Sequence, residues 1–133
     1  MNKLRKLHKE SDDSSQLASV IVEGILKKKG RDVKTLDLSK LGNAVCNYFV
    51  ICHGTSKTQV EAIAGSVLEE VLRADGSKPW HKEGFENAEW ILLDYVDVVV
   101  HIFDEDTRSF YNLENLWADA EIREFEDDQG NKG

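Results

Sequence analysis

The sequence predicts a single globular domain of the α/β class. Its 133 residues fall within the usual length of one domain, and 41% hydrophobic residues are enough for one continuous core. Two apolar, β-branched runs, Trp90–Leu93 and Val98–Phe103, stand on either side of a short polar turn, which indicates a β-hairpin. Segments with apolar residues at helical spacing lie on both sides of this hairpin and supply the helices.

The second run of the hairpin is predicted to be a central strand. Its alternate residues point to opposite faces of the sheet: Val98, Val100 and Ile102 to one face, and Val99, His101 and Phe103 to the other. Both faces carry mostly apolar groups, so both need covering. An edge strand would not show this pattern.

The hairpin turn, Asp94-Tyr95-Val96-Asp97, contains no Gly or Asn that would accept a positive φ. We therefore expect a turn or longer loop that keeps φ negative at Val96. Two carboxylates this close together allow three interpretations: turn chemistry, a binding surface, and metal or acid/base catalysis. The local sequence leaves all three open.

The charge of the chain argues against phosphate-driven binding. Seventeen basic residues against twenty-five acidic ones leave a formal net charge of −8. This is the wrong sign for a protein whose affinity comes from neutralising nucleic-acid phosphates. A basic partner would instead be attracted.

Cysteine usage and hydropathy predict a soluble, cytoplasmic protein. Cys46 and Cys52 fit no metal or redox spacing, and we interpret them as a small buried residue and its neighbour in a reducing compartment. No apolar run is long enough to span a bilayer, so no membrane partner is expected, and the N-terminus lacks the apolar core of a signal peptide.

No residue pattern indicates a catalytic or metal centre, and no cofactor is expected. The histidines share no ligand spacing; they are His8, His53, His81 and His101. In mid-strand, His101 is expected to be a hydrogen-bonded core residue. Ser56 has no His at the spacing of a nucleophile elbow, and in a strand Cys52 and His53 would point to opposite faces.

The chain begins with a polar segment, residues 1–15, whose serines and aspartates can cap the helix that follows. Apolar residues then recur at helical spacing; they are Leu17, Val20, Ile21, Ile25 and Leu26. The lysines of residues 27–29 complement the dipole at the end of this helix, and Gly30 is available as its C′ residue.

Two strands are expected next. Val33–Leu38 alternates apolar and polar residues, which is typical of an edge or half-covered strand. After a loop, the unbroken apolar run of residues 48–52 resembles a strand buried on both faces. His53-Gly54-Thr55 then turns the chain.

The next helix has the clearest end signals. Ser56 and Gln59 form a capping box at its start, and Gly76 is expected to end it. Its apolar stripe consists of Val60, Ile63, Ala64, Val67, Leu68, Val71 and Leu72. The Gly54-Thr55-Ser56 junction before it could hold an anion, although such loops more often only connect two elements.

Shorter elements complete the chain. A short strand is expected within Trp80–Gly84, and Thr107 is the expected N-cap of a closing helix. The apolar contacts of that helix are expected from Phe110, Tyr111, Leu113, Leu116 and Trp117. Residues 121–133 form an acidic tail that we expect to be disordered.

Three ordered blocks resemble a known family. They are Y-F-V-I-C-x-G-T-S at residues 48–56, E-G followed by A-x-W-I-L-L-D-Y-x-D-V-V-V-H at residues 83–101, and R-x-F-Y-x-L-E-x-L-W at residues 108–117. Together they identify the chain as similar to the ribosomal silencing factor family, also called RsfS or Iojap. The resemblance covers residues 16–120. Asn47 stands where the family usually has Asp, Val96 where many members have Gly, and His53 where a small hydroxyl residue is common.

The resemblance implies a fold and a function. The fold is a single domain with a mixed, mostly five-stranded β-sheet flanked by helices, similar to nucleotidyltransferases. The function is translation repression, not catalysis. Members bind the large ribosomal subunit through its fourteenth ribosomal protein at the intersubunit face, which blocks joining of the subunits when nutrients are scarce, and they tend to form homodimers. An acidic chain that meets a basic ribosomal protein agrees in sign with this function.

For the partner-binding site we expect one anchor and its acidic neighbours. Trp90 is the anchor, because tryptophan is enriched at interface hot spots, with Tyr95 beside it. Glu83, Asp94 and Asp97 are the expected charge partners for Arg or Lys. The alternative for Trp90 is core packing under the second helix.

The likeness to nucleotidyltransferases supplies a competing hypothesis, a metal-dependent or nucleotide-binding enzyme. Such enzymes need paired carboxylates close behind a Gly-Ser loop, because two metal ions must be bridged near the phosphates. Here the loop is followed by a helix without D-x-D, and the nearest such pair, Asp104 and Asp106, ends another strand. The required spacing is missing.

Overall fold

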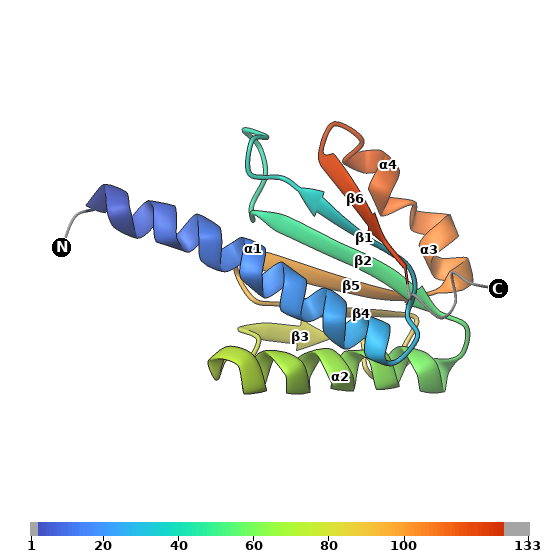
Figure 1. Ribbon diagram of the computed structural model, residues 1–133. Coiled ribbons are helices and arrows are strands. Elements are labelled where there is room, and N and C mark those ends of the chain that lie inside the picture. Colours follow the sequence, from blue (N-terminus) through green and yellow to red (C-terminus); the bar gives the residue numbers. More distant parts are fainter. Residues whose placement is uncertain (1–2, 127–133) are drawn as a thin grey trace.

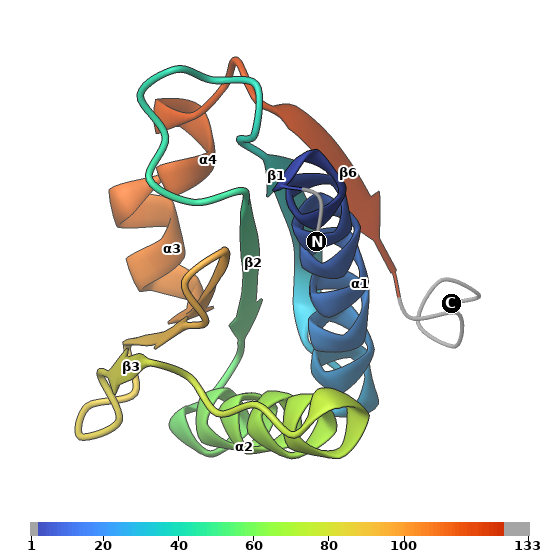
Figure 2. The same cartoon turned by 90° about the vertical axis from the view of Figure 1, so that its left-hand side faces the viewer.

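The computed structural model describes residues 3–126, and the side chains of residues 13–126. Its elements are, in chain order, α1 (Lys3–Lys27), β1 (Arg31–Asp37), β2 (Tyr48–Gly54), α2 (Lys57–Asp75), β3 (His81–Glu83), β4 (Trp90–Asp94), β5 (Val98–Asp104), α3 (Glu105–Tyr111), α4 (Leu113–Leu116) and β6 (Glu121–Phe125). One sheet separates two helical layers. The long helices α1 and α2 cover one face, and the short helices α3 and α4 lie on the other (Figures 1 and 2).

The strands form one mixed sheet in the order β3-β4-β5-β2-β1-β6. The β2–β5 pair is parallel, and all the other pairs are antiparallel. The predicted α/β class and mixed sheet are confirmed. The sheet has six strands, one more than the resemblance implied.

Strand β5 lies at the centre of the molecule, as predicted. It is hydrogen-bonded to β4 on one side and β2 on the other, and its residues 98–103 are all buried. Val98, Val100 and Ile102 join the apolar residues under α1 and α2, which we call the first core. Val99 and Phe103 join a separate cluster on the opposite face, the second core; its other buried members are Leu36, Leu38, Cys46, Phe49 and Ile51.

The chain ends differ from the prediction. Helix α1 begins at Lys3, not after residue 15, because residues 3–15 contain no Gly or Pro that would stop a helix. Residues 121–125 form strand β6 instead of a disordered tail, because all five pair with residues 33–37 of β1 and Phe125 packs against the first core. Strand β1 is therefore not an edge strand. The expected disorder of residues 127–133 lies outside the described residues.

The α1 terminus uses its glycine in another way than predicted. Lys29, with φ of 63°, takes the left-handed C′ position. Gly30 follows it and donates its N–H to the Ile25 carbonyl at 3.0 Å, which completes a Schellman motif. A Cβ on Gly30 would lie 2.2 Å from Ile25 Cγ2, so glycine is needed here for close packing and not for its φ.

The N-cap and the final glycine of α2 match the prediction, although the Gln59 side chain accepts the Thr55 N–H and not the Ser56 N–H of a capping box; the N-cap of α3 differs. Ser56 accepts the Gln59 N–H at 3.1 Å, and Gly76, with φ of 75°, ends α2. Helix α3 begins three residues before the expected site, because Asp104 is its N-cap and accepts the Thr107 N–H at 2.8 Å.

The hairpin turn contradicts the expectation for Val96, whose φ is +77°. The Asp97 N–H donates to the Tyr95 carbonyl at 2.9 Å, so Val96 is the central residue of a γ-turn. Asp94 Oδ1 accepts the Val96 N–H at 2.8 Å and stabilises this geometry. A β-branched residue is strained at positive φ, so the aspartates hold a conformation that the valine disfavours.

Val96→Gly is expected to raise the free energy of unfolding by about 1 kcal/mol, because glycine removes the strain and an exposed side chain gives up little packing. Urea denaturation measures the change. Val45→Gly is the matched control, since Val45 is equally an exposed loop valine but is not at positive φ; it should not gain stability. An unchanged or lower stability for Val96→Gly would contradict the strain.

Candidate functional site

The structure separates the five residues predicted to bind a partner. Trp90 and Asp94 lie on the second-core face of β4. Glu83, on β3, is paired with Leu92, midway between them, and so shares that face. Tyr95 is 8% exposed and packs into the first core on the opposite side, while Asp97 is an exposed residue after the turn. Three of the five therefore face the same way.

Trp90 is half-buried between the sheet and α3. Its ring centroid lies 4.9 Å from that of Phe103 and 4.8 Å from that of Tyr111. Its Nε1 donates to His101 Nδ1 at 3.1 Å. Helix α2 covers the other face, so Trp90 does not pack under it, and the core-packing alternative in that form is wrong.

The closing helices leave large apolar side chains in solvent. Phe110 is 80% exposed, Tyr111 50% and Leu116 74%, contrary to the expectation that they pack inward. Helix α3 has only seven residues, and α4 four, so each presents one narrow side to the sheet; Leu113 and Trp117 occupy the second-core contacts.

Three of these rings form a continuous chain that we call the aromatic surface: Trp90, Tyr111 and Phe110. The Phe110 and Tyr111 centroids are 5.0 Å apart in an edge-to-face arrangement, and Tyr111 in turn contacts Trp90. This row of three rings runs from the second core to the surface. Glu83 and Asp94 lie on the same sheet face, two and four residues along the β4 register from Trp90, so this face carries both apolar rings and carboxylates.

Buried Arg108 fixes α3 to the sheet. The side chain is only 6% exposed, and its Nε and Nη2 donate to Glu114 Oε2 at 3.2 and 3.0 Å. Its Nη1 donates to His53 Nδ1 at 3.0 Å and to the Arg31 carbonyl at 3.4 Å. Burial and the Arg108 charge both lower the pKa of His53, which keeps the imidazole neutral as an acceptor. Neither Arg108 nor Glu114 was predicted from the sequence to have a role, although both lie in the third block of the resemblance.

The Gly54-Thr55-Ser56 junction is filled by the protein itself. Gln59 Oε1 accepts the Thr55 N–H at 2.7 Å, and the same amide donates to the carbonyls of Lys28 and Lys29 at 3.2 and 3.1 Å. Two of the N–H groups that an anion could use here, those of Thr55 and Gln59, are therefore already occupied. The Gln59 side chain therefore links the start of α2 to the end of α1.

Both cysteine thiols are protonated at neutral pH. Burial is the main cause that raises the pKa of Cys46 to about 11 and that of Cys52 to about 12, so neither thiol ionises at neutral pH. Within the described part of the chain, no three His, Cys, Asp or Glu side chains come together as a metal site. None of the described helices is long and apolar enough to cross a membrane.

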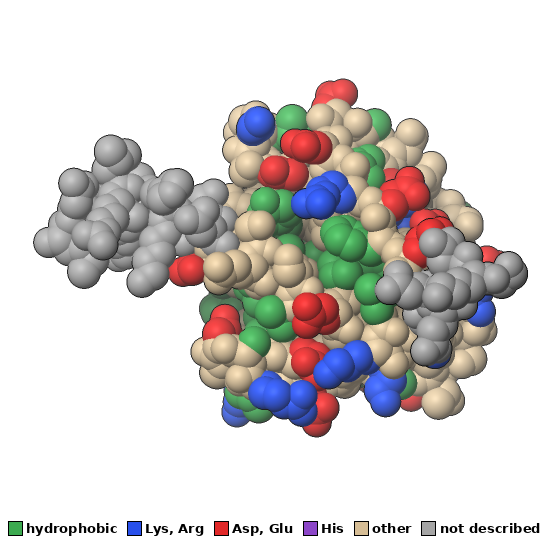
Figure 3. Space-filling view, in the orientation of Figure 1, with side chains coloured by type: hydrophobic (Ala, Val, Ile, Leu, Met, Phe, Trp, Pro, Cys, Tyr) green, Lys and Arg blue, Asp and Glu red, His purple; other side chains and the backbone are tan. Residues whose placement is uncertain are grey.

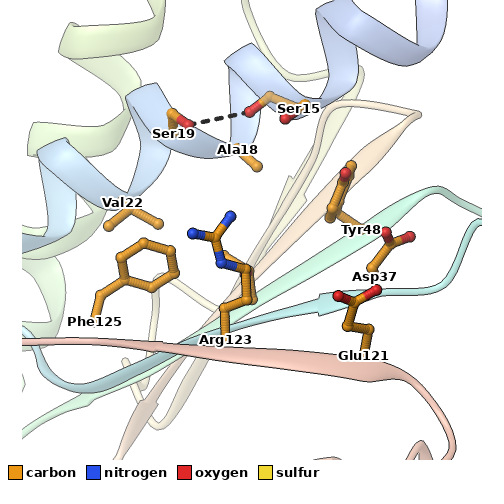
Figure 4. A pocket seen from close by; sticks show the side chains of 10 residues that line it. Ser15, Ala18, Ser19, Val22, Asp37, Tyr48, Glu121, Arg123 and Phe125 are labelled. Atoms are coloured by element: carbon orange, nitrogen blue, oxygen red, sulfur yellow. Dashed lines mark hydrogen bonds between the residues drawn. The ribbon is translucent and has the colours of Figure 1, made fainter.

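A polar groove of about 130 Å³ lies between α1 and β6 (Figure 4). Arg123 points from β6 toward α1, with Phe125 on one side and Glu121 and Asp37 on the other. On the α1 and α2 side of the molecule, acidic and basic side chains are interspersed (Figure 3). This side offers no surface of a single charge.

Arg108→Met is expected to lower the free energy of unfolding by about 3 kcal/mol, because the largely buried Glu114 carboxylate loses both guanidinium hydrogen bonds and keeps only the longer ion pair with Lys34 at 3.8 Å. Arg73→Met is the control: Arg73 also pairs with a glutamate but is 63% exposed, and the loss should stay below about 0.5 kcal/mol. Urea denaturation measures both. The double variant Arg108→Met/Glu114→Gln should recover part of the stability that Arg108→Met loses. If Arg108→Met lost no more stability than Arg73→Met, Arg108 would not fix α3 to the sheet.

Stability should fall at acid pH through His101. Burial lowers the pKa of this histidine to about 4, while in the unfolded chain it keeps its ordinary value of about 6.5. Between these values the unfolded chain binds a proton that the folded protein does not, so acid favours unfolding. Between about pH 7 and about pH 4.5, this difference lowers the free energy of unfolding by about 2 kcal/mol. Urea denaturation measures this. Over the same pH range, the free energy of unfolding of His101→Asn should fall by about 2 kcal/mol less than that of the wild type, and an identical fall would contradict the role of His101.

The chain is similar to proteins of one family. Residues 11–132 match the family model described as ribosomal silencing factor during starvation, RsfS. Ribosomal silencing factors from Halalkalibacterium halodurans and Bacillus subtilis are 40% and 42% identical, over 85% and 74% of this chain and 95% and 82% of theirs. The chloroplastic protein Iojap of Arabidopsis thaliana is 35% identical over 84% of this chain and 47% of its own length. A crystal structure from Chromobacterium violaceum superposes with a TM-score of 0.73 at 35% identity, covering 78% of this chain and 85% of that one. The chain belongs to the ribosomal silencing factor family.

Proposed function

We propose that this protein represses translation by binding the large ribosomal subunit through its fourteenth ribosomal protein, so that the small subunit cannot join. The family supplies the class of partner. The observation that carries the proposal is the aromatic surface, in which Phe110 and Tyr111 extend from half-buried Trp90 into solvent. The mechanism is steric: the bound protein occupies the face that the small subunit needs.

The aromatic surface has the properties of a binding hot spot. Trp and Tyr dominate such sites because they bury a large area and lose few rotamers. Tyr111 is held against Trp90, and Arg108 anchors the helix that carries it. Because Tyr111 and Trp90 are already packed against each other, binding them costs less conformational entropy than binding free side chains.

Charge supports the same partner. Ribosomal proteins are basic, and a net charge of −8 attracts them while it repels free RNA. Glu83 and Asp94, on the face that carries Trp90, are the proposed partners for Arg or Lys, and Asp97 contributes from beyond the turn. Tyr95 is left out of the proposed contact because it faces the first core.

No observation favours the enzyme alternative, and we propose a binding protein without catalytic activity. Gln59 fills the loop that would cradle a phosphate. Asp104, one member of the D-x-D pair, is engaged as the N-cap of α3. A cytoplasmic location, predicted from cysteine usage and hydropathy, and a homodimer, implied by the resemblance, complete the proposal.

Phe110→Ser should weaken binding to isolated large subunits by at least about tenfold, because a hot-spot ring is lost. Co-sedimentation measures it. Leu72→Ser is the matched control, because Leu72 is an exposed apolar residue on α2, and it should bind as the wild type does. Phe110 is 80% exposed, so the fold should survive, which circular dichroism checks.

Glu83→Lys should weaken the same binding and make it less sensitive to salt, whereas Glu61→Lys, an equally exposed glutamate on α2, should not. Wild-type protein that fails to co-sediment would overturn the proposed function. Equal weakening by the α2 controls would instead place the contact elsewhere on the protein.

A further inference from the structure

His101 is a polar residue in an apolar setting. It sits in the middle of β5 and is 4% exposed. Its ring meets Phe49 edge-to-face at 4.6 Å between centroids and stacks on Phe103 at 6.3 Å. Neither contact requires a nitrogen atom, so packing alone does not account for an imidazole at this position.

The bond to Trp90 fixes the protonation state of the imidazole. An indole N–H can only donate, so His101 Nδ1, at 3.1 Å, must accept, and the ring proton lies on Nε2. That Nε2 is buried and has no hydrogen-bond partner among the described side chains and backbone. A buried unpaired N–H destabilises the fold, and an apolar residue would avoid it. What the histidine supplies is the acceptor for Trp90.

The bond also determines what Trp90 presents to the outside. Trp90 is paired with Phe103 and Leu92 with His101, so indole and imidazole are diagonal neighbours on one face of the β4–β5 ladder. The single polar atom of the indole therefore points inward along the sheet. The rest of the indole contains only carbon, and the ring lies against that of Tyr111.

We propose that His101 is a positioning residue of the aromatic surface: it accepts the Trp90 N–H, holds the indole against Tyr111, and so presents a carbon-only ring to the partner. This rests on the proposed function, because it concerns the same contact with the large subunit. Without the acceptor, the Trp90 indole rotates so that water can bond to its N–H. The indole then no longer supports the rings of Tyr111 and Phe110.

Two variants separate the acceptor from packing. In asparagine the amide oxygen stands as many bonds from Cα as Nδ1 does in histidine, so His101→Asn keeps the acceptor. His101→Leu removes it and fills the space with carbon. The leucine leaves no polar atom unpaired, whereas the asparagine NH2 group takes the place of Nε2 as a buried donor, so urea denaturation checks that both variants fold.

The first readout is the free protein. In ¹⁵N-labelled samples the Trp90 indole resonance is identified by its loss in Trp90→Phe. Hydrogen exchange of this N–H should stay slow in the wild type and in His101→Asn, and accelerate by at least about tenfold in His101→Leu. Slow exchange in folded His101→Leu would overturn the proposal.

The second readout is co-sedimentation with isolated large subunits. His101→Leu should bind at least about tenfold more weakly than wild type, and His101→Asn within about threefold. If both variants bind as wild type, or both bind equally weakly, the acceptor does not position the interface and the proposal fails. If the wild type itself does not bind, the proposed function fails, while the exchange experiment still decides whether His101 orients Trp90.

Discussion

The central position of β5 constrains the rest of the structure. A strand hydrogen-bonded on both edges and apolar on both faces needs two separate covering layers. Helices α1 and α2 are 25 and 19 residues long and cover the first core. The second core has only the short helices α3 and α4 and the segment around Leu38 and Cys46. The thin layer is the one that leaves rings in solvent.

A short helix cannot hold its place by burial alone, and Arg108 makes up the difference. Seven residues bury too little apolar area to fix α3, so the buried guanidinium links it to α4, β1 and β2 through Glu114, the Arg31 carbonyl and His53. Such a buried ion pair contributes geometry more than net stability, because desolvation offsets much of the attraction. Geometry is what an exposed aromatic surface requires.

The parts of the fold that the sequence predicts are those in which local pattern and tertiary role agree. The β4–β5 hairpin and the caps of α2 at Ser56 and Gly76 belong to this class. Strand β6 was missed because its sequence, Glu-Ile-Arg-Glu-Phe, has only two apolar residues, and pairing with β1 decides its state. The positive φ of Val96 was missed because the aspartate bonds override the preference of the residue itself.

The candidate site could be predicted only in part for the same reason. Trp90, Asp94 and Glu83 carry residue types that indicate a protein contact, and the register places them on one face. Tyr95 has an equally suitable type, but the γ-turn directs it into the first core. The exposure of Phe110 depends on the lengths of α3 and α4, which no periodicity shows in segments of seven and four residues.

Unpaired buried polar atoms mark where this fold gives up stability. In the part of the chain that the structure describes they are Tyr95 Oη, His101 Nε2 and Glu114 Oε1. Two of the three belong to residues behind the aromatic surface: His101 holds Trp90, and Glu114 holds Arg108. Each of these residues binds its partner with one polar atom and leaves the other unsatisfied. A fold selected for stability alone would fill both places with carbon, so these residues are better explained by the ring positions they fix than by the core they line.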